Sequence, residues 1–193
     1  PIFMPKPIAG SNGSGMHVHQ SLFRGDTNAF FSDNEDHLSA EAKHFMAGLM
    51  YHAPAITSVT NQWVNSYKRL VAGYEAPIYV SWAKVNRSDL IRIPSYKEGR
   101  QESVRIEYRA PDPACNPYLA FAVMLAAGLD GIEKKLPIPE PINQDVNKMT
   151  DEERKERGIG VLPGTLSEAI SLTETSDLVR EDRKSTRLNS SHW

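Results

Sequence analysis

The sequence has little cysteine and no long hydrophobic run. Cys115 is the only cysteine among 193 residues, so an internal disulfide framework and a cysteine-based zinc site are both excluded. A single thiol fits a reducing compartment, and we expect a cytoplasmic protein. The longest apolar run, residues 119–129, is too short to span a bilayer, and no basic-then-apolar signal segment opens the chain. We therefore expect no membrane partner.

An excess of charge of one sign is also missing. The chain has 22 Lys and Arg against 24 Asp and Glu, a formal net charge of −2 and a pI near 6.4. This balance argues against a general nucleic-acid partner. The 40% of apolar residues are enough for a packed core, and the length fits one domain or a large piece of one.

Both ends of the sequence look cut. Residue 1 is proline rather than methionine. Residues 184–193 have no helical or strand period, and we interpret them as a disordered or non-native tail. We expect residues 1–135 to carry the functional motifs and residues 136–183 to form a C-terminal helical extension of the same domain.

Hydrophobic periodicity and turn signals predict an α+β domain. Strands are predicted over residues 16–22, 78–83, 90–93 and 103–109, and a long ordered loop over residues 61–75. Helices are predicted over residues 40–51, 117–135, 151–157 and from about 165 to 183. Ser39 and Asn116 are the expected N-caps of the first two helices, and Pro54 is the expected stop of the first. Leu119, Val123, Ala126 and Ala127 are expected to face the core.

Two short strands carry pairs of chemically active side chains. His17 and His19 would lie on one face, roughly 6–7 Å apart. Glu107 could give a hard oxygen to Mg²⁺ or Mn²⁺, and Arg109 could clamp a carboxylate or phosphate. Taken alone, the first pair is better explained as an ordinary polar face, and the second as a cross-strand salt bridge.

The segment from residue 68 to residue 109 is richer in cations than the rest of the chain. Its charge balance is +4, whereas the whole chain has −2. The cations are Lys68, Arg69, Lys84, Arg87, Arg92, Lys97, Arg100, Arg105 and Arg109. They are spread over loops and strands, an arrangement that suits a small polyanion such as a nucleoside triphosphate.

A glycine-rich loop, residues 12–15, precedes the first strand. Its backbone N–H groups could approach a ligand closely because no bulky Cβ intervenes. The loop lacks the Lys-Ser/Thr of a Walker motif and is not a dinucleotide fingerprint. By itself it is equally consistent with a tight turn.

Four blocks of sequence along the chain contain most of these candidate residues. The first block runs from Lys6-Pro7 through Asn12-Gly13-Ser14-Gly15-Met16-His17-Val18-His19-Gln20-Ser21. The second is Asn65-Ser66-Tyr67-Lys68-Arg69-Leu70-Val71-Ala72-Gly73-Tyr74-Glu75-Ala76-Pro77. The third is Asn86-Arg87-Ser88 with Ile91-Arg92-Ile93-Pro94, and the fourth runs from Arg105-Ile106-Glu107-Tyr108-Arg109 to Asn116-Pro117-Tyr118-Leu119-Ala120. Together and in this order, the four blocks resemble the bacterial-type glutamine synthetase family, and the resemblance covers roughly residues 1–183.

The resemblance implies ATP-dependent joining of ammonia to the γ-carboxylate of glutamate through a γ-glutamyl phosphate. Mg²⁺ or Mn²⁺ would be bound by His17 and Glu107. ATP would contact His19, Gln20, Ser21, Arg87, Arg92 and Lys97. Glutamate would contact Asn12, Gly13, Arg69, Glu75 and Arg109. Glu75, on a mobile flap, would take a proton from the attacking ammonia, and Arg87 would assist the transferring phosphate.

The same resemblance implies a partial catalytic domain, an antiparallel curved sheet flanked by helices, without the N-terminal β-grasp domain. It implies a homo-oligomer, a dodecamer of two hexameric rings with active sites between subunits. Further metal-binding glutamates of the family would lie before residue 1, so we expect this piece alone to be inactive and poorly soluble. Residues 145–149 contain no tyrosine, so adenylylation at that position is not expected.

Two other functions fit the residues. A γ-glutamyl-amine or polyamine ligase of the same superfamily would keep the ATP and glutamate chemistry and accept a larger amine. A non-catalytic structural relative would keep the fold alone, although such a scaffold has no use for this set of charges.

Overall fold

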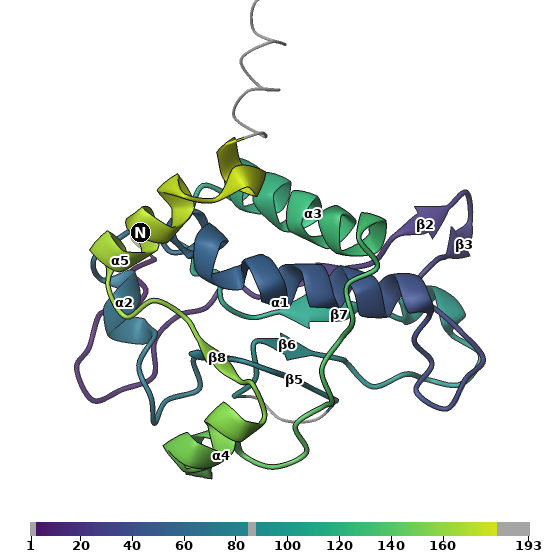
Figure 1. Cartoon of the computed structure of the whole chain (residues 1–193), viewed down its shortest axis with the longest axis horizontal. Helices are drawn as coiled ribbons and strands as arrows, with labels where there is room; N and C mark the ends of the chain where they lie inside the picture. Colours follow the sequence, from purple (N-terminus) through teal and green to yellow (C-terminus); the bar gives the residue numbers. More distant parts are fainter. Residues whose placement is uncertain (1–2, 85–87, 181–193) are drawn as a thin grey trace, which may run out of the picture.

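A computed structural model describes residues 3–84 and 88–180. Two long helices, α1 (Ala40–Thr60) and α3 (Pro117–Glu133), lie side by side above a small sheet (Figure 1). Helix α5 (Leu166–Glu174) packs against α1. The expected α+β class is confirmed. The expected tail, residues 184–193, lies outside the described residues.

The main sheet has the strand order β1 (Val18–Gln20), β7 (Ile106–Tyr108), β6 (Ile91–Arg92) and β5 (Trp82–Ala83). The first three strands are antiparallel, as expected, whereas β5 pairs with β6 in parallel. Two small ribbons complete the strands. They are β2 (Phe23–Arg24) with β3 (Thr27–Asn28), and β4 (Tyr79–Val80) with β8 (Gly160–Val161).

The side chains of strand β7 alternate between the two faces of the sheet. One face packs against the main core, and we call the opposite one the open face. Ile106 and Tyr108 are fully buried in the main core. Because side chains alternate along a strand, Glu107 points to the opposite face. The strand register sets His19 and Arg92 beside Glu107 on the two neighbouring strands. A line of polar side chains therefore crosses the open face.

Helix α1 begins at the expected N-cap, where the Ser39 hydroxyl accepts a hydrogen bond from the Ala42 N–H at 3.0 Å. The expected stop at Pro54 is wrong, because the helix continues to Thr60. A proline inside a helix costs about 3 kcal/mol. Beyond it, Ile56 and Thr60 are fully buried, and this burial offsets the cost since one buried isoleucine contributes about 2 kcal/mol.

Helix α3 begins as predicted, with the Asn116 side chain accepting from the Tyr118 N–H at 3.0 Å and Pro117 in the first turn. Val123 and Ala127 face the core, but Leu119 is 56% exposed. The core-facing assignment of Leu119 is therefore wrong, because the helix turns that position outward. Other large apolar side chains on α3 are also exposed, namely Tyr118, Phe121, Leu125 and Leu129.

Helices α1 and α3 touch through glycines. A Cβ on Gly48 would lie 2.2 Å from the Ala127 carbonyl oxygen and 2.8 Å from Gly131 Cα. A Cβ on Gly131 would lie 2.2 Å from the His44 carbonyl oxygen. The two backbones approach each other so closely that no side chain fits between them.

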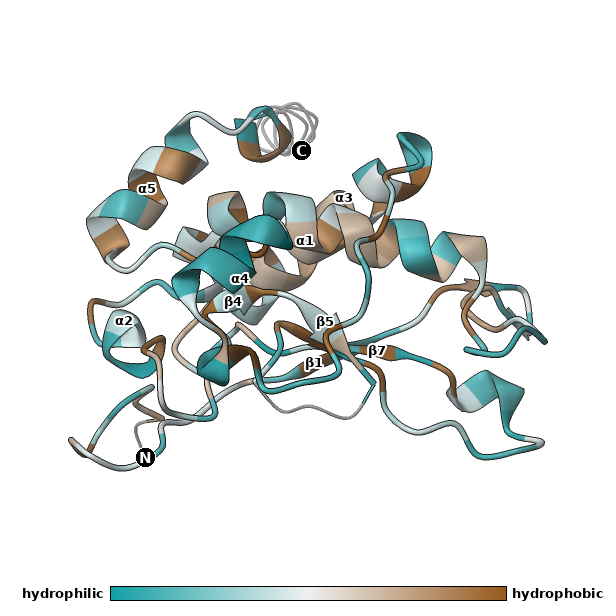
Figure 2. Cartoon of the chain, turned by 60° about the horizontal axis from the view of Figure 1, so that its bottom comes forward, coloured by the Kyte–Doolittle hydropathy of each residue, from teal (hydrophilic) through white to brown (hydrophobic). Residues whose placement is uncertain are grey.

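The remaining elements are short. Within the expected loop 61–75 the chain forms helix α2 (Ser66–Arg69). The 3-10 turns η1 (Gln101–Ser103) and η2 (Val146–Lys148) and helix α4 (Asp151–Glu156) follow. The predicted last helix is interrupted, since α5 ends at Glu174 and residues 177–180 are helical again. In Figure 2, α4 has the colour of hydrophilic residues along its length, whereas α1 and α3 include more hydrophobic residues. In the described part of the chain, no helix is long and apolar enough to cross a membrane.

Candidate active site

The open face of the sheet is centred on Glu107. Its Oε1 lies 3.0 Å from Nδ1 of His17, which precedes β1. Its Oε2 accepts a hydrogen bond of 2.5 Å from Nε of Arg92 on β6. A largely buried carboxylate thus joins an imidazole from the segment before β1 and a guanidinium from β6.

These neighbours set the charges of the cluster. Burial raises the pKa of Glu107, but the hydrogen bond and charge of Arg92, with His17 and Arg109, outweigh it and hold the pKa below its usual value. Burial and the charge of Arg109 lower the pKa of His17, against the opposing effect of Glu107. At neutral pH the cluster therefore combines a carboxylate with a neutral imidazole, and a neutral imidazole has a lone pair to donate.

The residues predicted to contact ATP begin beside this cluster. His19 accepts a hydrogen bond at Nδ1 from Nε of Arg105, at 3.1 Å. Gln20 donates to Sδ of Met124 at 3.8 Å, so its side chain leans against α3. Ser21 follows directly and is half-buried. Arg105 was counted among the cations but not assigned a role, and its contact with His19 adds it to the candidate site.

Arg109 lies directly after β7 and is 4% exposed. Its backbone N–H donates to the Leu90 carbonyl oxygen at 2.9 Å. Its Nε is 4.0 Å from Oε1 of Glu107, too far for a hydrogen bond. Within the described residues, Nε and Nη1 have no hydrogen-bond partner. The buried guanidinium of Arg109 therefore has hydrogen-bond donors available to bind an anionic ligand.

Arg69 holds the chain on either side of the site. Its guanidinium donates to the carbonyl oxygens of Ala110 at 2.7 Å and Arg109 at 3.1 Å. Burial lowers its pKa to about 10, against the opposing charge of Asp112. Arg69 was predicted to hold glutamate, and the structure adds a structural task, fixing the backbone that carries Arg109.

The glycine-rich loop packs directly on Arg69. A Cβ on Gly13 would lie 2.3 Å from the Pro5 carbonyl oxygen, and one on Gly15 would lie 2.6 Å from Nη2 of Arg69 and 2.8 Å from Nε2 of His17. Only glycine therefore lets the loop run between the arginine and the imidazole.

A buried amide network anchors the segment that follows β7. Asn61, at the end of α1, donates to the Ala110 carbonyl oxygen at 2.9 Å and to Oδ2 of Asp112 at 2.8 Å. The two side chains are fully buried. The C-terminal end of α1, beyond Pro54, therefore supports the position of Arg109.

Glu75 lies at a separate, more open part of the same surface. It is exposed and follows Gly73, whose φ of +85° favours glycine. A cavity of about 400 Å³ is bordered by residues of three predicted blocks and the region before α4, namely Asn12, Gly73, Tyr74, Glu75, Ser88, Asp145 and Asn147. Asn12 and Glu75, which are both predicted to contact glutamate, therefore border the same cavity.

Lys97, a predicted ATP contact, is not brought to the cluster. Lys97 is exposed in the loop after β6, and its carbonyl oxygen accepts from the Arg100 N–H at 2.9 Å. Among the described residues no contact joins Lys97 to the cluster. Arg87 lies outside the described residues.

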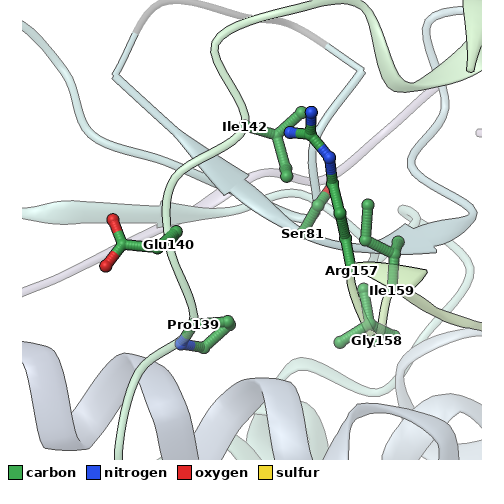
Figure 3. Close-up of a pocket in the computed structure, with 8 residues that line it drawn as sticks. Ser81, Pro139, Glu140, Ile142, Arg157, Gly158 and Ile159 are labelled. Atoms are coloured by element: carbon green, nitrogen blue, oxygen red, sulfur yellow. The ribbon is translucent and has the colours of Figure 1, made fainter. Parts of the chain in front are cut away.

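Sequence reasoning missed Asp89, which is fully buried between Ser88 and the start of β6. Ser81 Oγ donates to Oδ1 of Asp89 at 2.5 Å. Ser81 also lines a cavity of about 340 Å³, bordered by residues of the segment before α4 and by Arg157, Gly158 and Ile159, which lie between α4 and β8 (Figure 3). A lone acid before an apolar run gave no spacing or periodicity signal for burial.

The arrangement limits what the site can do chemically. A carboxylate, imidazoles and arginines gathered on one sheet face are a donor set that could hold an anionic ligand together with a divalent cation. In the described ranges, no three His, Cys, Asp or Glu side chains come together as a metal cluster, so His17 and Glu107 would supply only part of a coordination sphere.

Comparison with known proteins gives the family. A family model described as "Glutamine synthetase, catalytic domain" matches residues 2–188. The chain is 54% identical over 178 residues to a glutamine synthetase of Thermotoga maritima, covering 92% of the chain and 40% of the relative. It is 54% identical over 180 residues to one of Methanosarcina mazei and 53% identical over 180 residues to one of Thermus thermophilus, in each case with 93% of the chain and 40% of the relative.

This chain belongs to the glutamine synthetase catalytic-domain family. It spans 40% of the length of the curated relatives it matches.

Proposed function

We propose that this chain forms part of an enzyme that joins ammonia to the γ-carboxylate of glutamate, with ATP as co-substrate. The observation that carries the proposal is the contact of His17, Glu107 and Arg92 on one sheet face, with the idle donors of Arg109 beside it. Membership of the family supports the same reaction.

The residues present fit a divalent cation. Glu107 offers a carboxylate with a low pKa, and the low pKa of His17 keeps its lone pair free. A ligand set of oxygen and nitrogen atoms suits Mn²⁺, and a ligand set of oxygen atoms suits Mg²⁺. A bound cation would neutralise charge on the nucleotide phosphates. Other ligands would come from water, phosphate or polypeptide outside the described residues.

The protein residues position the reactants. Arg92 and Arg105 bring positive charge to the sheet face where His19, Gln20 and Ser21 would contact ATP. Arg109 would bind a carboxylate of glutamate through Nε and Nη1, and Asn12 and Gly13 would line its other side. Phosphoryl transfer consists largely of such positioning and charge neutralisation. Arg87 and Lys97 remain proposed phosphate contacts.

Glu75 would act in the second step. An acyl phosphate reacts readily with water, so a lid over the site is needed. Glu75 lies at the rim of the cavity that also contains Asn12, on a loop where Gly73 gives the backbone freedom. As a carboxylate it would attract ammonium and take its proton as nitrogen attacks the acyl carbon.

The proposal is tested in the longest natural chain that carries this sequence. We expect glutamine formation from glutamate, ammonium and ATP, with Mg²⁺ or Mn²⁺ required. Glu107→Gln should lower turnover at least a hundredfold, whereas the control Glu102→Gln, which removes an exposed carboxylate paired with Arg100, should not. Equal turnover in the two variants would contradict the proposal. Faster turnover with alkylamines than with ammonium would assign the enzyme to the amine ligases.

We also propose that residues 1–193 alone are inactive, because they supply only part of the metal site. The proposed homo-oligomer would complete that site with polypeptide from elsewhere. A γ-glutamyl transfer assay on the purified 193-residue chain should give no signal above background, and clear activity would refute this proposal.

A further inference from the structure

Lys6 is a buried lysine that stands in the first block of the resemblance without a role of its own. Only 9% of its surface is exposed. A buried ammonium group must find partners, because an isolated buried charge is strongly unfavourable. The partners of Lys6 therefore indicate what its side chain does.

A single side chain fixes the backbone of Lys6. The Lys6 N–H donates to Oδ1 of Asn65 at 2.7 Å, and Nδ2 of Asn65 donates to the Lys6 carbonyl oxygen at 3.0 Å. Asn65 directly precedes α2, the helix that carries Arg69. The segment that holds Arg69 thus also sets the point from which the Lys6 side chain extends.

The ammonium group of Lys6 joins two loops. Its Nζ donates to the carbonyl oxygen of Ser11, the residue before the glycine-rich loop. The same Nζ lies 3.4 Å from the centre of the Tyr74 ring, well within the range of a cation–π interaction. Because Tyr74 directly precedes Glu75, one buried side chain connects the glycine-rich loop with the Glu75 loop.

The two connected loops border the same cavity. Asn12, Tyr74 and Glu75 line it, whereas Lys6 does not border it in the described part of the chain. Gly73, with a φ of +85°, leaves the backbone before Tyr74 adaptable. Among residues 3–84 and 88–180, no side-chain hydrogen bond or ion pair holds Tyr74 or Glu75. The contact with Lys6 is therefore the polar attachment of this loop that the structure describes.

We propose that Lys6 is a positioning residue that holds Tyr74 against the glycine-rich loop and so keeps Glu75 at the rim of the cavity. This inference rests on the proposed function. Without the attachment the Glu75 loop would open more often, and water would reach the acyl phosphate. The water oxygen would attack the γ-acyl carbon, and the bond from that carbon to the phosphate oxygen would break. Glutamate, phosphate and a proton would be released in place of glutamine.

Four variants separate this contact from ordinary packing. Lys6→Met keeps the apolar stem of the side chain and removes its charge, whereas Lys6→Arg keeps a cation that also stacks on aromatic rings. Tyr74→Leu removes the ring, whereas Tyr74→Phe keeps the ring face and removes only the hydroxyl. The contact needs a cation and a ring face, so Lys6→Arg and Tyr74→Phe are the matched controls.

The first arm of the test measures the attachment and needs no turnover. Chymotrypsin cuts after Tyr74 only when that side chain leaves its place, so the initial cleavage rate in the complete chain follows the open population. Lys6→Met should raise this rate by roughly two- to thirtyfold, the range expected for one cation–π contact. Lys155→Met, a change of an exposed lysine on α4, should not change it.

Two outcomes of this arm would overturn the inference. One is an unchanged cleavage rate after Tyr74 in Lys6→Met. The other is faster cleavage after Phe3 alone, because that result would limit Lys6 to anchoring the N-terminal segment.

The second arm measures phosphate released per glutamine formed, in the complete chain at limiting ammonium. The unaltered enzyme should release about one phosphate for each glutamine, because its site excludes water. Lys6→Met and Tyr74→Leu should release excess phosphate, and both matched controls should behave as the unaltered enzyme does. A partly unfolded enzyme would lose phosphate release and glutamine formation equally. An unchanged ratio in Lys6→Met would therefore overturn the inference.

The double variant, Lys6→Met with Tyr74→Leu, shows whether the two side chains act through their contact. Its phosphate-to-glutamine ratio should equal that of the worse single variant, because one contact can be lost only once. Effects that multiply would contradict the inference. If Lys6→Met does not fold, Tyr74→Leu, which changes a half-buried loop residue, carries the same test.

Failure of the inference can be told apart from failure of the proposed function. If the unaltered enzyme forms no glutamine, the proposed function fails, while the cleavage after Tyr74 still decides whether Lys6 holds the Glu75 loop.

Discussion

Nδ1 of His17 lies 3.0 Å from Oε1 of Glu107, although the two residues are 90 positions apart in the chain. The antiparallel pairing of β1 with β7 creates this contact, because the register places His19 opposite Glu107 and leaves His17 two residues away on the same face. The contact is the geometric condition for any shared ligand of the two side chains.

Removing the carboxylate at the centre of this cluster should destabilise the fold. Glu107→Gln leaves Arg92 and Arg109 without their common counter-charge, and we expect a loss of about 1–3 kcal/mol in the free energy of unfolding, after allowing for the partial exposure of Arg92. Urea unfolding at pH 7 measures it. Glu102→Gln, on an exposed pair, should change nothing measurable, and equal effects of the two variants would count against a buried cluster.

The loop glycine at position 15 should be intolerant of any side chain. Gly15→Ala places a Cβ within 3 Å of both Arg69 and His17, so one of them must move. We expect at least a tenfold loss of turnover in the complete enzyme, with unfolding shifted by less than about 1 kcal/mol, because the loop is exposed. Gly164→Ala is the control, since its nearest neighbour is 3.9 Å away. Equal activity in the two variants would show that the loop has room to adapt.

Asp89 should make the protein less stable as the pH rises. Its pKa in the folded state, about 6, is above the ordinary 3.8, so folding favours the protonated form. The stability supplied by protonation is present below pH 4 and is lost as the pH rises toward 7. The stability of Asp89→Asn relative to the unaltered protein should therefore increase by about 2–3 kcal/mol from pH 4 to pH 7. Thermal unfolding at both pH values measures it, and a constant difference would contradict the raised pKa.

Asp130 on α3 should have the opposite dependence on pH. Burial raises its pKa, but hydrogen bonds from His52 and Lys134, at 2.8 Å each, hold the pKa below its usual value. Its contribution is present above pH 4 and is lost as the pH falls further. Asp130→Asn should cost about 1 kcal/mol at pH 7 and nothing near pH 2.

The control for this prediction is Asp33→Asn, an exposed carboxylate. It should leave the unfolding midpoint unchanged at both pH values. A cost for Asp130→Asn that persists at pH 2 would point to lost packing rather than to the ion pairs.

Local signals predicted much of the fold. The caps at Ser39 and Asn116 were found because an Ncap side chain bonds its own first turn, an interaction that needs no distant partner. Pro54 and Leu119 were misjudged because both outcomes depend on tertiary packing. The end of α1 beyond Pro54 packs into the core, whereas the side of α3 that carries Leu119 is exposed.

For the candidate site too, some residues could be predicted from sequence motifs and others only from the tertiary structure. Motifs with an ordered spacing predicted His17, Glu107, Arg92 and Arg109 as site residues, and the structure brings the four together. Asp89 and Arg105 received no role, since burial and a partner across the sheet decide their importance. The structural task of Arg69 was likewise invisible, because its acceptors are backbone carbonyls that no side-chain pattern reveals.

The close glycine contact between α1 and α3 couples the positions of the two helices. No space for a side chain remains between Gly48 and Gly131. A bulkier residue at either position must therefore shift one whole helix rather than a neighbouring side chain. Asn61 at the far end of α1 would carry that shift to the backbone around Arg109. Substitutions far from the reacting groups can thus alter substrate affinity. In a screen for substitutions that change activity without touching the site, we expect the residues of this contact to be prominent.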